Sequence, residues 1–149
     1  PKSIWLPRLK KANVIVVGGG NTTHLMKCII DSGLKDELHA LLKNRIYVGI
    51  SAGSIVINKT LNTSSEFLYG DEEKNAPKGL GFANFNIRPH LNSPHFPRVT
   101  EENMKKVTGK LSGDVYALDD NSAVVVNGNK IYVISEGVWK KFSGKKRVG

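Results

Sequence analysis

Short apolar runs alternate with amphipathic stretches along this chain. The runs are rich in Val and Ile, which is typical of strands buried in a parallel sheet, and they cover residues 13–17, 45–50, 84–87 and 115–118. Apolar residues at helical spacing, with polar capping residues before them, predict helices over residues 24–31 and 34–43. A further helix is expected from the end of the second run to about residue 58, and another begins at Thr100.

Two more apolar runs near the C-terminus predict a hairpin. Residues 123–126 and 131–134 flank Asn127-Gly128-Asn129-Lys130, a turn sequence that favours antiparallel pairing. One further strand is expected over residues 138–142. Strands that alternate with helices predict an α/β fold, in which helices sandwich a mainly parallel sheet and a β-hairpin lies at the C-terminal end.

The length of 149 residues and the absence of repeats indicate a single domain over residues 1–149. Residues 62–79 are polar and predict a long surface loop, and residues 143–149 form a basic tail. The chain begins at Pro1, and its first clear strand leads at once into a glycine-rich turn. Because a parallel sheet covered on both faces usually has more strands, we expect that an N-terminal part of the fold is missing from this chain.

Composition narrows the class of protein. No apolar run approaches the ~18–20 residues of a membrane span, and no signal peptide opens the chain. Cys28 is the single cysteine, so an internal disulfide framework is excluded, and its apolar position on a helix predicts a buried side chain. We therefore expect a cytoplasmic protein without a membrane partner.

The formal net charge of +9 raises the question of nucleic-acid binding. The basic residues gather mostly at the two ends of the chain, at Arg8, Lys10, Lys11, Lys140, Lys141, Lys145, Lys146 and Arg147. They neither alternate with aromatic residues nor follow one helix, as nucleic-acid binding surfaces require. The charge therefore indicates a solvated surface and a loose tail, although a positive field favours anionic substrates.

The stretch Gly49-Ile50-Ser51-Ala52-Gly53 fits the pattern Gly-x-Ser-x-Gly between an apolar strand and an apolar helix. In such a nucleophile elbow the strand turns directly into a helix, and the serine hydroxyl projects at the carboxyl end of the sheet. The N–H group of Ala52 would then face a developing oxyanion. The alternative is that Ser51 merely caps the helix.

Three glycines, Gly18 to Gly20, follow the first strand and allow the backbone to approach a ligand closely. The segment does not match the dinucleotide-binding or phosphate-binding patterns. A hydrolase would use such a loop for its second oxyanion donor, and the alternative is a tight turn.

A serine nucleophile needs a base. His24 and His39 fall on predicted helices, whereas His90 and His95 lie in an irregular segment bounded by prolines. His90 is the better candidate, because it directly follows a strand and can reach the same edge of the sheet as the elbow. The two histidines also suggest a metal site, but no third ligand has a recognisable spacing.

An acid should orient the imidazole of the base. Asp119 and Asp120 both follow a predicted strand, and either can take this part; the alternative is an Asp-rich turn. The resulting order of serine, histidine and acid differs from that of the α/β-hydrolases, in which the acid precedes the histidine.

The order resembles the class I glutamine amidotransferase-like group, and within it the peptidase E family of α-aspartyl dipeptidases, to which cyanophycinase is related. The resemblance rests on four stretches, VIVVGGGNT, YVGISAGS, LGFANFNIRPHLN and YALDDNSAVVVNG. They cover most of the chain from about Ala12 to Gly128.

The resemblance implies that Ser51 is the nucleophile, His90 the base and Asp120 the orienting acid. Most characterised relatives have Glu at the position of Asp120, and the shorter Asp can still orient a histidine if its loop lies closer. The resemblance also implies oxyanion donors in the N–H groups of Ala52 and of Gly19 or Gly20.

The family uses an arginine to bind the aspartyl carboxylate of the substrate, because the guanidinium fork holds a carboxylate through two hydrogen bonds. Arg98 is the nearest match, with Arg88 as the alternative. Asn21 is a further candidate for substrate binding.

We therefore expect a serine peptidase that hydrolyses dipeptides or short peptides with an N-terminal aspartate through an acyl-enzyme, without a metal or organic cofactor. One alternative is a related peptidase with another substrate, such as an aspartate-rich polymer. Another is a catalytically silent homologue that acts as a binding protein. The partner implied is a small peptide, and the sequence leaves open whether the chain forms a homodimer.

Overall fold

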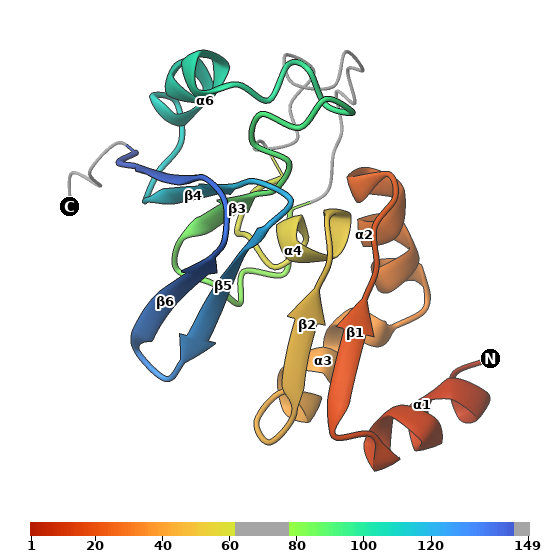
Figure 1. Ribbon diagram of the computed structural model, residues 1–149. Coiled ribbons are helices and arrows are strands. Elements are labelled where there is room, and N and C mark those ends of the chain that lie inside the picture. The colour runs from red at the N-terminus through yellow and green to blue at the C-terminus, as the bar shows by residue number, and fades with distance from the viewer. Residues whose placement is uncertain (62–77, 145–149) are drawn as a thin grey trace.

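The computed structural model describes residues 1–61 and 78–144 (Figure 1). The elements of the first segment are α1 (Lys2–Lys11), β1 (Val14–Val17), α2 (Thr22–Asp31), α3 (Leu34–Leu41), β2 (Ile46–Gly49) and α4 (Ala52–Ile55). Those of the second segment are β3 (Asn86–Arg88), α6 (Glu101–Thr108), β4 (Val115–Leu118), β5 (Ser122–Asn127), β6 (Lys130–Ser135) and β7 (Trp139–Phe142). Most of the predicted loop over 62–79 and of the basic tail over 143–149 lies outside the described residues.

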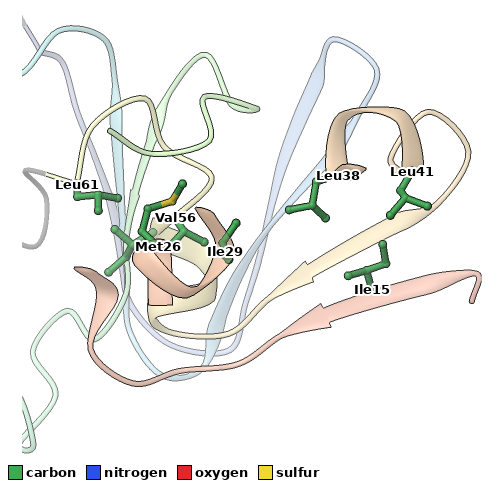
Figure 2. Close-up of a cluster of buried hydrophobic side chains, with 8 residues drawn as sticks. Ile15, Met26, Ile29, Leu38, Leu41, Val56 and Leu61 are labelled. Atoms are coloured by element: carbon green, nitrogen blue, oxygen red, sulfur yellow. The ribbon is translucent and has the colours of Figure 1, made fainter. Parts of the chain in front are cut away.

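Strands β1 and β2 pair in parallel and carry one of the hydrophobic cores on one face (Figure 2). Helices α2 and α3 pack on this face through Met26, Ile29, Leu38 and Leu41, which surround Ile15 of β1. The side chains that alternate with Ile15 point to the other face. There Val16 is 61% exposed and Ile46 is 63% exposed.

Strand β4 lies in the middle of a second sheet, between the parallel strand β3 and the antiparallel strand β7. All four of its residues are buried, and they alternate between two cores. Val115 and Ala117 face the core that includes Met104 of α6, whereas Tyr116 and Leu118 face the core against which the hairpin packs. This burial on both faces explains why the sequence shows an unbroken apolar run here.

The predicted hairpin is confirmed as β5 and β6, which pair antiparallel from Ser122↔Ser135 to Asn127↔Lys130. Gly128 occupies the turn with φ of 57°, a left-handed conformation that glycine adopts without strain. The predicted start of α6 is also confirmed, since the Thr100 hydroxyl accepts a hydrogen bond of 3.2 Å from the N–H of Asn103.

Helix α1 is absent from the prediction because no apolar stripe marks it, and none of its residues is buried. Contacts with distant residues hold both of its ends. Lys2 forms an ion pair with Glu37 at 2.6 Å, and Arg45 donates hydrogen bonds to the carbonyl oxygens of Lys10, at 2.5 Å, and Ala12, at 3.0 Å.

The expectation of a buried Cys28 is wrong, because its side chain is exposed and lies 3.5 Å from Nε2 of His24. The buried face of α2 includes Met26 and Ile29, and Cys28 stands two residues after Met26, on the opposite side of the helix.

In the described part of the chain, no helix is both long and apolar enough to cross a membrane. The parallel ladders β1–β2 and β3–β4 belong to separate sheets, as hydrogen bonding defines them. With helices packed against parallel strands and a hairpin at the C-terminal end, the predicted α/β fold is present.

Candidate active site

The turn from β2 into α4 forces Ser51 into an unusual conformation. Its φ is 55° and its ψ is −116°, outside the regions that residues other than glycine prefer. The chain is crowded on both sides of the serine: a Cβ on Gly49 would lie 2.6 Å from the carbonyl oxygen of Gly53, and a Cβ on Gly53 would overlap the carbonyl oxygen of Val17. Both glycines of the motif are therefore required by the close approach of backbone to backbone.

The backbone of the turn is held by hydroxyl groups. Ser54 donates a hydrogen bond of 2.6 Å to the carbonyl of Ser51, and Tyr47 donates one of 2.6 Å to the carbonyl of Gly53. Burial raises the pKa of Tyr47, so this hydroxyl remains a donor. Ser51 itself makes no side-chain capping bond to α4. The capping interpretation therefore does not account for its hydroxyl.

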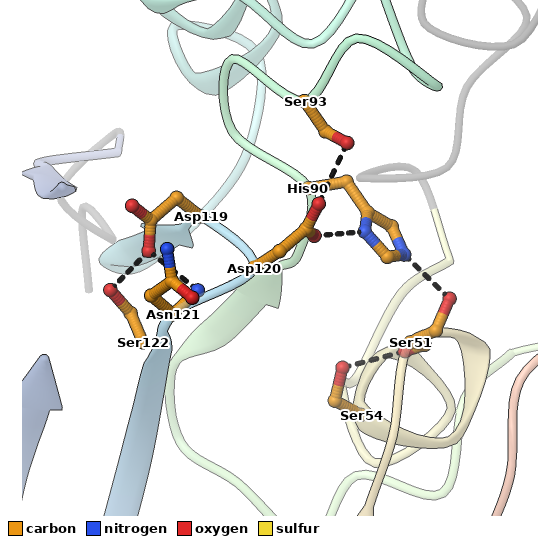
Figure 3. A network of polar contacts seen from close by, with 8 residues as sticks. All are labelled: Ser51, Ser54, His90, Ser93, Asp119, Asp120, Asn121 and Ser122. Atoms are coloured by element: carbon orange, nitrogen blue, oxygen red, sulfur yellow. Dashed lines mark hydrogen bonds and ion pairs between the residues drawn. The ribbon is translucent and has the colours of Figure 1, made fainter. Parts of the chain in front are cut away.

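The hydroxyl of Ser51 points instead to an imidazole (Figure 3). Its Oγ lies 2.8 Å from Nε2 of His90, which follows the end of β3. His90 has a φ of 68°, and the N–H of the next residue, Leu91, bonds to the carbonyl of Leu118 at the end of β4. The ring of Phe96 stacks on the imidazole with 4.1 Å between centroids and 14° between planes.

The other nitrogen of His90 meets a carboxylate. Nδ1 lies 2.6 Å from Oδ1 of Asp120, and Ser93 donates a hydrogen bond of 2.7 Å to Oδ2 of the same side chain (Figure 3). The hydrogen bond from Ser93, followed by that from His90, lowers the pKa of Asp120, so the carboxylate is ionised near neutral pH. Because an ionised carboxylate only accepts, Nδ1 carries the proton, and Nε2 of the neutral imidazole is left to accept from Ser51.

The neighbouring carboxylate, Asp119, turns away from the imidazole. It accepts hydrogen bonds from the hydroxyl of Ser122 at 2.5 Å, the N–H of Asn121 at 3.1 Å and the N–H of Val138 at 2.5 Å. Burial works to raise the pKa of Asp119, but these hydrogen bonds lower it overall. Of the two aspartates that the sequence left open, Asp120 contacts His90, and Asp119 joins the end of β4 to the start of β7.

A buried amide links the half of the site that carries the serine to the half that carries the histidine. Asn58, which is fully buried just after α4, donates a hydrogen bond of 3.0 Å to the carbonyl of Ile87 and accepts one of 2.9 Å from its N–H. Its side chain thus pairs with β3 as a neighbouring strand would. This contact sets the distance between α4, which follows Ser51, and β3, which precedes His90.

The glycine-rich loop lies against the serine. A Cβ on Gly19 would be 3.2 Å from Cβ and 3.5 Å from Oγ of Ser51, so the loop passes directly over the nucleophile candidate. Gly20 has a φ of 123°, which an L-residue rarely adopts. Ala52 is buried at the first position of α4. The three residues predicted as oxyanion donors therefore flank Ser51 or lie in the loop above it, and their role remains a prediction.

The three residues predicted to bind substrate lie in different settings. Arg98 is exposed at the end of the loop that begins at His90, and Arg88 in β3 is 0% exposed. The side chain of Asn21 caps α2 by accepting a hydrogen bond of 2.8 Å from the N–H of His24. Arg98 is thus the more accessible of the two arginines, and the binding roles of all three residues remain predictions.

The described residues contain no group of three or more His, Cys, Asp or Glu side chains placed to hold a metal ion. His95 lies exposed, five positions after His90, and contributes a positive field that lowers the pKa of Asp120.

Sequence reasoning missed three residues around this site: Ser93, Phe96 and Asn58. Each of the three contacts a residue that lies farther along the sequence than the spacing of a helix turn or of a strand repeat, so no periodic pattern marks it. The one available signal was the position of Ser93 and Phe96 in the irregular segment after His90, since side chains on such a segment can fold back over the residue that opens it.

Comparison with known proteins relates this arrangement to one family. Residues 3–134 match Peptidase family S51. The chain is 29% identical over 147 residues to a protein named Peptidase E from Nostoc sp., a match that covers 89% of this chain and 60% of that protein. It is 28% identical over 141 residues to a Drosophila melanogaster protein named "Probable alpha-aspartyl dipeptidase", covering 90% of this chain and 58% of that protein. The chain therefore spans about 60% of the length of these curated relatives.

Solved structures resemble the fold. A protein from Listeria monocytogenes EGD-e, provisionally named a peptidase E, superimposes with a TM-score of 0.70 at 21% identity, over 88% of this chain and 63% of that one. A peptidase from an acI-B1 Actinobacterium gives a TM-score of 0.68 at 16% identity, over 94% of this chain and 60% of that one. These likenesses confirm the predicted fold class.

Proposed function

The chain belongs to peptidase family S51, and from this membership we propose that it forms the catalytic part of a serine peptidase acting on dipeptides or short peptides with an N-terminal aspartate. Ser51 is the nucleophile of this proposal, His90 its general base and Asp120 the acid that orients the base. We also propose a cytoplasmic location.

One observation carries the proposal: two hydrogen bonds in series join the three side chains. Ser51 Oγ lies 2.8 Å from Nε2 of His90, and Nδ1 of His90 lies 2.6 Å from Oδ1 of Asp120. The first distance lies within the range in which a base can take a proton from a hydroxyl group, and the second lets the carboxylate orient that base. The positive φ of Ser51 supports the same reading, since backbone strain of this kind is concentrated at functional sites.

The reaction begins when Ser51 Oγ attacks the carbonyl carbon of the scissile bond and Nε2 of His90 takes the hydroxyl proton. Asp120 keeps the proton on Nδ1 and stabilises the imidazolium that forms. The N–H groups of Ala52 and of Gly19 or Gly20 would donate to the oxyanion of the tetrahedral intermediate. His90 then gives its proton to the leaving amine as the C–N bond breaks, which leaves the acyl-enzyme. Water next attacks the acyl carbon while Nε2 of His90 takes a proton from it, and His90 returns that proton to Ser51 Oγ as the acid product leaves.

The proposed preference for aspartate has its own support. The Drosophila relative carries α-aspartyl dipeptidase in its name, and the net charge of +9 favours anionic substrates. Arg98 is the candidate to bind the aspartyl carboxylate, because it is exposed and follows the loop that holds the base.

Hydrolysis of Asp-Leu, with Leu-Leu and Glu-Leu as controls, tests the proposal directly. We expect release of leucine from Asp-Leu alone, lost in Ser51→Ala, and labelling of wild-type Ser51 by a fluorophosphonate. Hydrolysis that persists in Ser51→Ala would refute the mechanism. A folded wild-type chain that is neither labelled nor active would favour a silent binding protein, whereas cleavage of other peptides would refute only the substrate preference.

A further inference from the structure

We propose that Ser93 is a positioning residue of this site, whose hydroxyl holds the carboxylate of Asp120 in the orientation that presents Oδ1 to His90. The inference rests on the proposed function, because it assigns a part in the same catalytic arrangement to a residue outside the three.

Ser93 and His90 each form a hydrogen bond to a different oxygen of the Asp120 carboxylate. The hydroxyl of Ser93 donates to Oδ2 at 2.7 Å, while Oδ1 lies 2.6 Å from Nδ1 of His90 (Figure 3). Two donors on two different oxygens fix the plane of the carboxylate, which one donor alone leaves free to rotate. This second contact matters because the Asp120 side chain is 48% exposed. A carboxylate so exposed has water as a competing partner, and a single hydrogen bond from histidine is a weak restraint there.

The hydroxyl that performs this task is itself held in place. Ser93 is only 5% exposed, and its backbone forms two hydrogen bonds within the loop, from its N–H to the carbonyl of His90 at 3.2 Å and from the N–H of Phe96 to its carbonyl at 3.0 Å. Asn92 is fixed with a φ of 58° and bonds through its N–H to the carbonyl of Val99 at 2.8 Å. The loop after the base is therefore a rigid support, and a rigid support is what a preorganised site requires.

A hydroxyl that donates to a carboxylate also stabilises its charged form. The hydrogen bond from Ser93 is the largest influence that lowers the pKa of Asp120, ahead of that from His90. Among the described residues, the charge of His95 lowers the pKa of Asp120 further, and the charge of Asp120 in turn raises the pKa of Asp119. Loss of the Ser93 hydroxyl should therefore raise the pKa of Asp120 and release its carboxylate toward water.

The chain offers a matched control for this test. Ser122 donates a hydrogen bond of 2.5 Å to Asp119, the adjacent carboxylate that does not contact His90. Ser122→Ala removes the same chemical group from the same kind of bond, on the aspartate next to Asp120, together with a contact of 2.7 Å to the hydroxyl of Ser135. Ser93→Cys is a second variant, since its thiol nearly preserves the shape of the side chain but donates weakly.

The experiment measures kcat and KM on the substrate of the wild-type chain, and the pKa of the Asp120 carboxyl by ¹³C NMR. In Ser93→Ala and Ser93→Cys we expect kcat to fall about tenfold to a hundredfold at constant KM, as for loss of a hydrogen bond to a charged group, and the pKa of Asp120 to rise. Ser122→Ala should change neither quantity. The inference is overturned if kcat or the pKa of Asp120 in the folded Ser93 variants matches that of Ser122→Ala.

The NMR measurement needs no turnover, so it separates the two proposals. An inactive wild-type chain in which Ser93→Ala still raises the pKa of Asp120 would refute the proposed function and keep the positioning role. An active wild-type chain in which Ser93→Ala is equally active would keep the proposed function and refute the positioning role.

Discussion

Replacing Asp120 by Asn is the sharpest test of how the site is built, because it keeps the shape of the side chain but removes its charge and turns one acceptor into a donor. In the wild-type chain both carboxylate oxygens accept, one from His90 and the other from Ser93. An amide has one accepting oxygen and one donating nitrogen. The variant therefore cannot accept from both neighbours at the same time.

The outcome of that competition follows from the contacts of Ser93. Its hydroxyl sits on a rigid, buried loop and lies 2.7 Å from Oδ2, so the amide oxygen is expected to turn toward it. The amide nitrogen then faces Nδ1 of His90 and donates to it. This drives the proton to Nε2, the nitrogen that must accept from Ser51, and the imidazole is held in the wrong tautomer.

The size of the effect can be placed between two limits. In well-studied serine proteases, loss of the aspartate by the same change costs roughly 10⁴-fold in kcat. Asp120 is 48% exposed, so water can compete with the amide for His90 and restore part of the correct tautomer. We therefore expect kcat to fall about 10²-fold to 10⁴-fold in Asp120→Asn, which corresponds to about 3 to 5 kcal/mol in activation free energy.

The assay is steady-state hydrolysis of the best wild-type peptide, with Asp119→Asn as the matched control. Asp119 accepts from Ser122, Asn121 and Val138 rather than from His90, so its variant should lose thermal stability and keep a kcat close to that of the wild-type chain. The reasoning is refuted if Asp119→Asn loses more activity than Asp120→Asn, or if both variants turn over at the wild-type rate.

Further predictions concern the packing around the site. Gly53→Ala should abolish the cooperative thermal transition seen by circular dichroism, since its Cβ would overlap the carbonyl of Val17; a native-like transition would contradict this. Asn58→Leu should lower the free energy of unfolding in urea by about 2 to 4 kcal/mol, because two buried hydrogen bonds to Ile87 are lost. Phe96→Leu should lower kcat roughly 2-fold to 30-fold, because the stacked ring stabilises the imidazolium of His90 through a cation–π interaction. An unchanged kcat would show that the ring contributes only packing.

Acid stability follows from the same carboxylates. The pKa values of Asp119 and Asp120 are both lowered in the folded chain. The hydrogen bond from Ser122 is the largest of those that lower the pKa of Asp119, and the hydrogen bond from Ser93 is the largest of those that lower the pKa of Asp120. A carboxyl group whose pKa falls on folding stabilises the chain fully above its ordinary pKa of about 4, and this contribution is lost as the pH falls through the folded value. Unfolding monitored by circular dichroism should therefore show this loss of stability below about pH 4, and a loss centred near pH 6 would point to histidine instead.

The order of strands and helices could be predicted because its signals are local. The apolar run of β4 has the predicted bounds, Val115–Leu118, and the turn at Gly128 joins the hairpin as expected. The elbow at Ser51 is marked by an equally local sequence pattern, and Gly49 meets backbone atoms of the same turn, whereas the contact that requires Gly53 is with Val17 of the neighbouring strand β1. Where the signal depended on a partner far along the chain, prediction failed, as it did for α1, which Arg45 and Glu37 hold. The prediction for Cys28 failed for a local reason, because the residue lies on the side of α2 opposite Met26.

The sequence by itself therefore determined which residue types follow each strand, and so brought Ser51, His90 and the pair of aspartates to one edge of the fold. Only the tertiary structure decided how their side chains meet. Asp119 and Asp120 are adjacent and chemically identical, and their place after the strand does not separate them; only the family resemblance implied Asp120. The first is turned to Val138 and the second to His90 and Ser93, because the direction of a side chain beyond a strand end is set by the donors that surround it. Those donors come from segments that only folding brings together.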